Sequence, residues 1–158
     1  MKNLKAQQGF TLLELMVVLV IVAVIAAFAY PSYMNSVQKS RRTDAFTSLN
    51  EIAHLQEEYF IRNRSYAKEL KQLGYSDNTI DSEKKEYDIS MSAEPSGCSG
   101  NSTLVCQSFE VSAVPNTQAG QPTGQAKDEN CQVLILNNQG RKTAKDKSDN
   151  DSTQQCWR

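Results

Sequence analysis

The 158-residue sequence lacks most of the motifs that mark small enzymes and nucleic-acid-binding proteins. It has a single histidine, His54, and it has neither a Gly-rich phosphate loop nor a nucleophile motif. Its formal charge is −1, so there is no overall basic surface for nucleic acid and no strong acidic bias. The sequence therefore predicts a protein without catalytic activity and without a cofactor, whose partners the net charge does not indicate.

Metal sites are also poorly supported. The four cysteines are widely spaced, no C-x-x-C occurs and the lone histidine is far away in sequence, which argues against zinc. His54 lies beside Ile52 and Leu55 and reads as a structural histidine. Asp149 and Asp151 alternate like calcium ligands, but the rest of the EF-hand pattern is missing. We therefore expect no bound metal.

Cations are absent between Phe10 and Gln38, where the chain has a long apolar run instead. From Phe10 to Tyr30 only Thr11 and Glu14 are polar, and a helix of this length measures about 31 Å, enough to cross a bilayer. Lys2 and Lys5 precede the run without any acid. The positive-inside rule therefore keeps Met1 in the cytoplasm and exports the chain after Tyr30.

Glu14 is unexpected in such a segment. A carboxylate at the centre of a membrane helix costs roughly 2.5–3.5 kcal/mol, so these residues usually have a partner. The span holds no cation, but a cut between Gly9 and Phe10 would create an amino group one helical turn from Glu14. That amine could belong to the same chain or to a neighbouring copy.

These residues also carry a family resemblance. Lys5-Ala6-Gln7-Gln8-Gly9-Phe10-Thr11-Leu12-Leu13-Glu14 resembles the leader and cleavage site of type IV pilins and of the related type II secretion pseudopilins, and Tyr30-Pro31-Ser32-Tyr33 matches what often follows their apolar segment. The resemblance implies that a prepilin peptidase cuts after Gly9 and methylates Phe10. It also implies that Glu14 neutralises the Phe10 terminus of an adjacent subunit during filament assembly.

The resemblance further implies the partners and the location. We expect other pilin subunits, the prepilin peptidase and an inner-membrane assembly platform as partners, with functions in fimbrial adhesion and twitching motility. The chain would be a single-pass inner-membrane protein with a periplasmic C-terminus before assembly, and part of an extracellular pilus afterwards. A signal peptide cut after Ala27-Phe28-Ala29, or a plain membrane anchor, would explain neither Glu14 nor the Gly9-Phe10 junction.

The predicted organisation has three parts: a leader at 1–9, a transmembrane and filament-core helix at 10–30, and an exported head at 31–158. From Pro31 to about Asn63 the helix continues and becomes amphipathic, with Pro31 as a kink. The predicted apolar stripe contains Ala45, Leu49, Ile52, Ala53, Leu55, Tyr59 and Phe60, and the predicted polar face contains Arg41, Arg42, Asp44, Glu51, Glu57, Glu58 and Arg62.

The period then changes from helical to alternating. Strands are predicted at 87–92, 108–113 and 131–137, with a short fourth strand at 141–143, while 65–85 reads as a connection with a helical turn at 68–73. The sequence thus predicts an α+β fold in which the long helix packs on a sheet of three or four antiparallel strands, as in type IV pilins.

All four cysteines fall in the exported part, where disulfides persist. Three connectivities are possible. Cys98–Cys106 and Cys131–Cys156 are favoured because each closes a local loop, and the second resembles the C-terminal disulfide loop of pilins. Chain entropy gives about 2.6 kcal/mol for the first loop and about 3.5 kcal/mol for the second.

The type of subunit is less determined. The run from Cys131 to Leu136, followed by Gly140 and Cys156-Trp157, resembles PilE-type minor pilins, which implies a role in pilus assembly or initiation. A type II secretion pseudopilin and a DNA-binding minor pilin are the alternatives. The candidate DNA contacts are Arg141, Lys142, Lys145, Lys147 and Trp157. Interleaved aspartates leave residues 141–158 with a net charge of only +2, so a solvated loop is the default interpretation of this segment.

Overall fold

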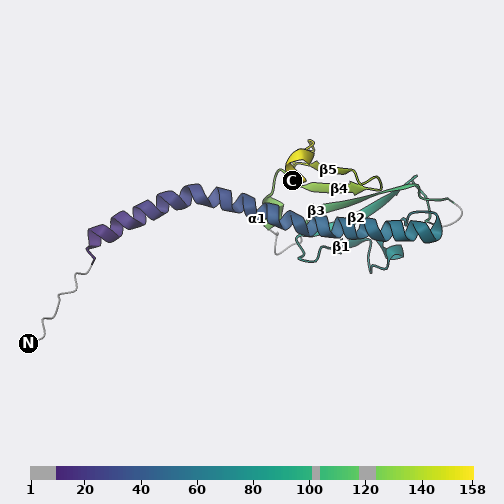
Figure 1. Cartoon of the computed structure of the whole chain (residues 1–158), viewed down its shortest axis with the longest axis horizontal. Helices are drawn as coiled ribbons and strands as arrows, with labels where there is room; N and C mark the ends of the chain where they lie inside the picture. The colour runs from purple at the N-terminus through teal and green to yellow at the C-terminus, as the bar shows by residue number, and fades with distance from the viewer. Residues whose placement is uncertain (1–9, 101–103, 118–123) are drawn as a thin grey trace, which may run out of the picture. The chain divides into compact units, whose positions relative to one another are not determined.

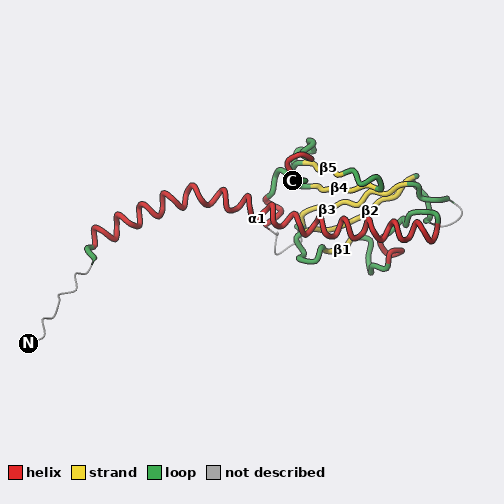
Figure 2. Tube along the Cα trace, in the orientation of Figure 1, coloured by secondary structure: helices red, strands yellow, loops and turns green. Residues whose placement is uncertain are grey.

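The protein is described by a computed structural model covering residues 10–100, 104–117 and 124–158. The chain divides into two compact units, one ending at Val37 and the other formed by Gln38–Arg158. The first contains the apolar half of helix α1 (Leu12–Asn63), and the second contains the remainder of α1 and the sheet. From here on, the name head means Gln38–Arg158, seven residues shorter at its start than the predicted head at 31–158. Figures 1 and 2 show these elements.

Helix α1 is long because its sequence contains almost nothing that would stop it. There is no glycine between Gly9 and Gly74, and the one proline, Pro31, lies inside α1. The predicted kink at Pro31 stays a prediction. The helix ends where Arg64 adopts a left-handed conformation with φ 58° and donates its backbone N–H to the carbonyl of Phe60 at 2.8 Å. This agrees with the helix end predicted at about Asn63.

The head contains a five-stranded antiparallel sheet in the simple order β1-β2-β3-β4-β5. Its strands are β1 (Thr79–Asp81), β2 (Tyr87–Glu94), β3 (Ser108–Pro115), β4 (Val133–Asn137) and β5 (Lys142–Lys145). The last four correspond to the predicted strands. The prediction of three or four strands missed β1, because three residues with one apolar side chain, Ile80, are too few to show an alternating pattern.

One face of the sheet packs against α1, as Figures 1 and 2 show, and forms the core of the head. Alternation along the strands sends every second side chain to this face. One row of aligned residues crosses all five strands on the core side: Ile80, Ile89, Ala113, Leu134 and Ala144. The helix contributes Ala45, Leu49 and Ile52, which are fully buried as the predicted stripe requires.

The predicted polar face of the helix was wrong at two positions. Arg42 and Asp44 are buried in the head, and Gln56 is buried as well. Helical periodicity assigned the two charged residues to solvent because it weighs only the apolar character of a side chain. Each is buried because another segment supplies a partner: Asp128 for Arg42, and the hydroxyl of Ser82 for Asp44.

Short elements complete the head. A 3-10 helix, η1 (Leu70–Leu73), occupies the predicted helical turn and is ended by Gly74, whose φ of 100° suits glycine. A second one, η2 (Gly124–Lys127), precedes β4, and α2 (Thr153–Cys156) lies in the C-terminal segment. The sequence analysis predicted no helix in this segment, so α2 was missed.

Candidate functional site

The first candidate site is the apolar half of α1. Its apolar side chains are exposed in the isolated chain, including Phe10 with 87% of its surface accessible. Among the described residues, α1 is long and apolar enough to cross a membrane by length and composition. Such a surface is stable only when lipid or other apolar helices cover it.

The start of α1 is fixed by a side-chain cap. The hydroxyl Oγ1 of Thr11 accepts a hydrogen bond from the backbone N–H of Glu14 at 3.2 Å, and the carbonyl of Thr11 accepts one from Leu15 N–H at 3.2 Å. Thr11 is therefore the N-cap residue and Phe10 lies before the helix. The predicted cleavage position Gly9 lies outside the described residues, while Phe10 and Glu14 are exposed.

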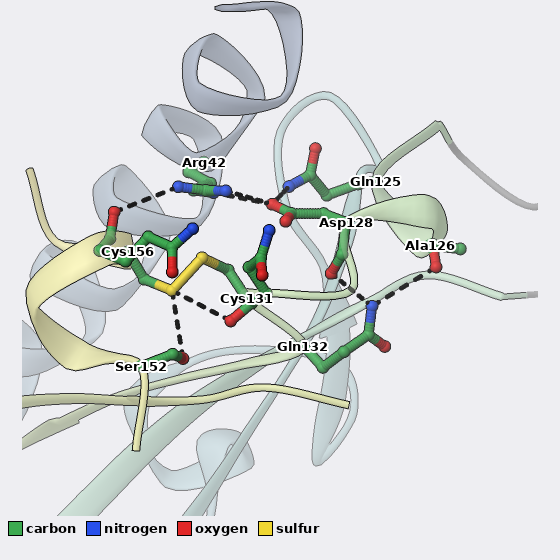
Figure 3. A network of polar contacts seen from close by, with 10 residues as sticks. Arg42, Gln125, Ala126, Asp128, Cys131, Gln132, Ser152 and Cys156 are labelled. Atoms are coloured by element: carbon green, nitrogen blue, oxygen red, sulfur yellow. Dashed lines mark hydrogen bonds and ion pairs between the residues drawn. A yellow bond between two sulfur atoms is a disulfide. The ribbon is translucent and has the colours of Figure 1, made fainter. Parts of the chain in front are cut away.

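A second feature is a buried polar network that joins α1 to the C-terminal half of the head (Figure 3). Arg42 donates to Oδ2 of Asp128 from Nε at 2.8 Å and pairs with it through Nη2 at 2.7 Å. Gln125 Nε2 donates to the same oxygen at 2.8 Å, and Arg42 Nη1 reaches the carbonyl of Gln155 at 3.5 Å. The network connects the helix to the loop before β4 and to the segment around α2.

Two disulfides fix the loops of the head. They join Cys98 to Cys106 and Cys131 to Cys156, which are the pairs favoured by local loop closure. Figure 3 shows the second one beside the Arg42 network. It holds α2 against the start of β4, so the C-terminal segment is fixed by a covalent bond and by hydrogen bonds together.

The structure separates the residues that the sequence grouped as possible DNA contacts. Lys145 Nζ pairs with Asp149 at 3.0 Å, and Lys147 Nζ pairs with Glu129 at 2.9 Å, so both charges are compensated. Arg141 and Lys142 are exposed at the turn between β4 and β5. The predicted basic group is therefore reduced to these two cations.

Trp157 is held in place by its neighbours. Its ring stacks on Phe46 with centroids 4.5 Å apart, and Lys142 Nζ lies 5.2 Å from the ring centroid. Its indole Nε1 donates to the carbonyl of Thr143 at 2.9 Å. A nucleic-acid base could stack on this ring only by displacing a neighbour, so Trp157 joins the C-terminus to α1 and β5.

Sequence reasoning missed one pair of cations. Lys84 and Lys85 are exposed in the turn between β1 and β2, and within the described ranges no ion pair joins either of them to an acid. The run Glu83-Lys84-Lys85-Glu86 carries two acids and two cations, so its formal charge is zero. In the structure Glu86 Oε1 pairs instead with Nε of Arg41 at 3.2 Å, which shows that the acid belongs to another contact.

The other polar residues considered from the sequence have structural contacts. His54 Nδ1 lies 3.6 Å from Glu58 on the exposed side of α1. Asp146 accepts backbone N–H groups from Ser148 and Asn150, and Asp151 accepts that of Thr153. Over residues 10–100, 104–117 and 124–158, no group of three or more His, Cys, Asp or Glu side chains is arranged to hold a metal ion.

Two known families match this chain. Residues 4–30 match the prokaryotic N-terminal methylation motif. Residues 31–135 match the family described as type IV minor pilin ComP, DNA uptake sequence receptor. The second match covers most of the head and more than half of the chain.

Curated relatives agree with these matches. The type IV major pilin protein PilA of Myxococcus xanthus is 30% identical over 69 residues, 44% of this chain and 31% of the relative. The type II secretion system core protein G of Vibrio cholerae is 35% identical over 66 residues, 42% of this chain and 45% of the relative. The type IV wide pilus major component PilA4 of Thermus thermophilus is 38% identical over 66 residues, 42% of this chain and 48% of the relative.

This chain spans less than half the length of each of these three relatives. The expected pilin resemblance and the expected α+β pilin-like fold are nevertheless both confirmed, as is the minor-pilin assignment. The chain belongs to the type IV pilins, in the family described as type IV minor pilin ComP, DNA uptake sequence receptor.

Proposed function

We propose that this chain is a minor subunit of a type IV pilus, and that its head binds DNA on the pilus surface without catalysing a reaction. The observation that carries the proposal is the match of residues 31–135 to a minor-pilin family named for DNA uptake sequence reception. This match covers most of the head, so it favours a pilus subunit over a type II secretion pseudopilin.

The proposed route into the filament begins in the inner membrane, with the head in the periplasm and the apolar half of α1 in the bilayer. A prepilin peptidase hydrolyses the Gly9–Phe10 bond: water supplies the oxygen of the new Gly9 carboxylate, and Phe10 becomes the new amino terminus. A sulfonium methyl donor then methylates that amine. The partners are the peptidase, the assembly platform and other pilin subunits.

Glu14 would select the position of the subunit in the filament. An unpaired carboxylate or amine costs several kcal/mol in an apolar core, so the stagger that places Glu14 beside the Phe10 amine of an adjacent subunit is stabilised. A head-to-tail contact of this kind does not close, and repetition generates a helix. Glu14→Ala should insert in the membrane without being incorporated, and normal incorporation would contradict this role.

The DNA-binding surface is proposed from exposed cations that form no ion pair with an acid of the described residues. Such cations gain most from contact with phosphate, because no existing ion pair must be broken. Lys84 and Lys85 lie in the turn before β2, within the residues that match the receptor family. Arg141 lies in the turn before β5 and Lys142 is the first residue of that strand, at the opposite end of the sheet and outside the matched residues.

The test compares three pairs of substitutions in the full chain, purified in detergent micelles. We expect Lys84→Gln with Lys85→Gln to weaken binding to duplex DNA. The plot of log affinity against log salt should become less steep by about 1.8, since each phosphate contact contributes about 0.9 to its steepness. Arg141→Gln with Lys142→Gln tests the second surface. Lys145→Gln with Lys147→Gln is the matched control, because both lysines are already paired.

The outcomes are distinct. An unchanged affinity and salt slope in both test pairs would end the DNA-binding proposal. An equal loss in the control pair would show that binding follows net charge and not these surfaces. Mass spectrometry of sheared filaments tests the pilus role separately: the chain should be a trace component beginning with methylated Phe10, and an incorporated form that begins at Met1 would contradict it.

A further inference from the structure

We propose that Arg41 is a positioning residue for the DNA-binding surface at Lys84 and Lys85, because it engages the carboxylate of Glu86, the acid that follows them in the chain. The inference rests on the DNA binding included in the proposed function. Nε of Arg41 lies 3.2 Å from Oε1 of Glu86, and the two side chains are 34% and 16% exposed. The contact is therefore partly sheltered from solvent, and salt screens it less than a fully exposed pair.

The backbone of the two lysines is held on α1 by a different residue. Asp44, three residues after Arg41, accepts the backbone N–H of Lys84 at 3.2 Å and the hydroxyl of Ser82. The backbone N–H of Lys85 donates to the carbonyl of Ser82 at 2.8 Å. Because these contacts fix the turn without Arg41, the loss of Arg41 should change the charge beside the lysines and not the course of the chain.

The charge balance of this turn depends on Arg41. The run from Glu83 to Glu86 has a formal charge of zero, and Arg41 makes it positive. Without Arg41, the Glu86 carboxylate would either pair with one of the lysines or remain within the Debye length of about 10 Å from a phosphate bound there. In both cases it would cancel about one cation, which is the equivalent of one phosphate contact.

Gly124 leaves the space that the Arg41 side chain occupies. A Cβ added to Gly124 would lie 1.9 Å from Nη1 of Arg41, so the guanidinium group would have to move. Gly124 does not have a left-handed φ, and its backbone therefore accepts alanine. Gly124→Ala thus displaces Arg41 without changing any charge, which separates the position of the cation from its presence.

The test measures binding of the full chain in micelles to duplex DNA over a range of salt concentrations. Arg41→Gln should bind about eightfold more weakly at roughly 0.1 M salt, and its plot of log affinity against log salt should be less steep by about 0.9, the effect of one phosphate contact. Gly124→Ala should weaken binding in the same direction. Arg41→Gln combined with Glu86→Gln should bind as the native chain does, because the acid is removed as well.

The matched control is Arg62→Gln, which removes the same charge from another ion pair of α1, that with Glu58. It should leave the affinity unchanged. Urea midpoints followed by Trp157 fluorescence show whether each variant is folded in the assay. If Gly124→Ala does not fold, the comparison of Arg41→Gln with the double substitution still decides the inference.

Several results would overturn the inference and leave the proposed function intact. One is unchanged binding by Arg41→Gln while Lys84→Gln with Lys85→Gln weakens it. Another is a double substitution as weak as Arg41→Gln alone, because Arg41 would then contact phosphate itself. A third is native binding by a folded Gly124→Ala variant, since net charge would then explain the loss in Arg41→Gln. If no pair of exposed cations contributes to DNA binding, the proposed function itself fails.

Discussion

Replacing Arg42 by methionine should destabilise the head more than any substitution of an exposed charge. In the native head, Nε and Nη2 of Arg42 both contact Oδ2 of Asp128, at 2.8 and 2.7 Å. The Asp128 side chain is 0% exposed and that of Arg42 is 9% exposed. Methionine fills similar volume but leaves the carboxylate buried, with the Gln125 amide as its one remaining side-chain donor among the described residues. Removing one partner of a buried pair costs about 3–5 kcal/mol, a large part of the roughly 5–15 kcal/mol that stabilises a domain.

The assay is urea unfolding of the full chain in micelles, followed by fluorescence of the single tryptophan, Trp157. This residue is a direct reporter because it stacks on Phe46 of α1. Adding Asp128→Asn to Arg42→Met should recover part of the loss, since the buried charge is removed. The matched control is Arg62→Met, whose ion pair with Glu58 has side-chain exposures of 73% and 44% and should contribute at most about 0.5 kcal/mol. Equal midpoints for Arg42→Met and Arg62→Met would refute the reasoning.

Three further changes have defined outcomes. Burial, and then the neighbouring Asp81 carboxylate, raise the pKa of Asp88. Asp88→Asn should therefore stabilise the head by a few tenths of a kcal/mol at neutral pH. This gain in stability should vanish as the pH falls through that raised pKa, because the native side chain is then protonated. Thermal unfolding at several pH values measures this, and a gain that grows in acid would contradict it. Replacing Cys131 and Cys156 together by serine should lower stability by about 3.5 kcal/mol in the same urea assay, and an unchanged midpoint would show that the loop is held by its other contacts. Ser82→Ala should lower stability by about 1–3 kcal/mol, because the buried carboxylate of Asp44 loses its hydroxyl donor. A loss near zero would mean that the backbone N–H of Lys84, which donates to Asp44 at 3.2 Å, satisfies the carboxylate by itself.

Local patterns predicted those parts of the fold that depend on neighbours in sequence. Four of the five strands, the end of α1 near Asn63 and the helical turn before Gly74 all follow from alternation, helical period or a positive φ at glycine. The short β1 was missed because it is a strand only through its pairing with β2. Likewise, the sequence grouped Arg141, Lys142, Lys145 and Lys147 as one basic cluster, and it could not show that two of the four are compensated by acids from other positions.

The sequence by itself determined the apolar run from Phe10 to Tyr30, the acid within it and the pilin-type junction before it, because these features depend on composition and spacing along one segment. Only the tertiary structure decided which charges are buried and which are free. Arg42 lies 86 residues from Asp128, and Asp44 lies 38 residues from Ser82. A charged side chain can leave water only when a partner is brought to it, and in this head the partners come from loops that no periodic pattern connects to the helix.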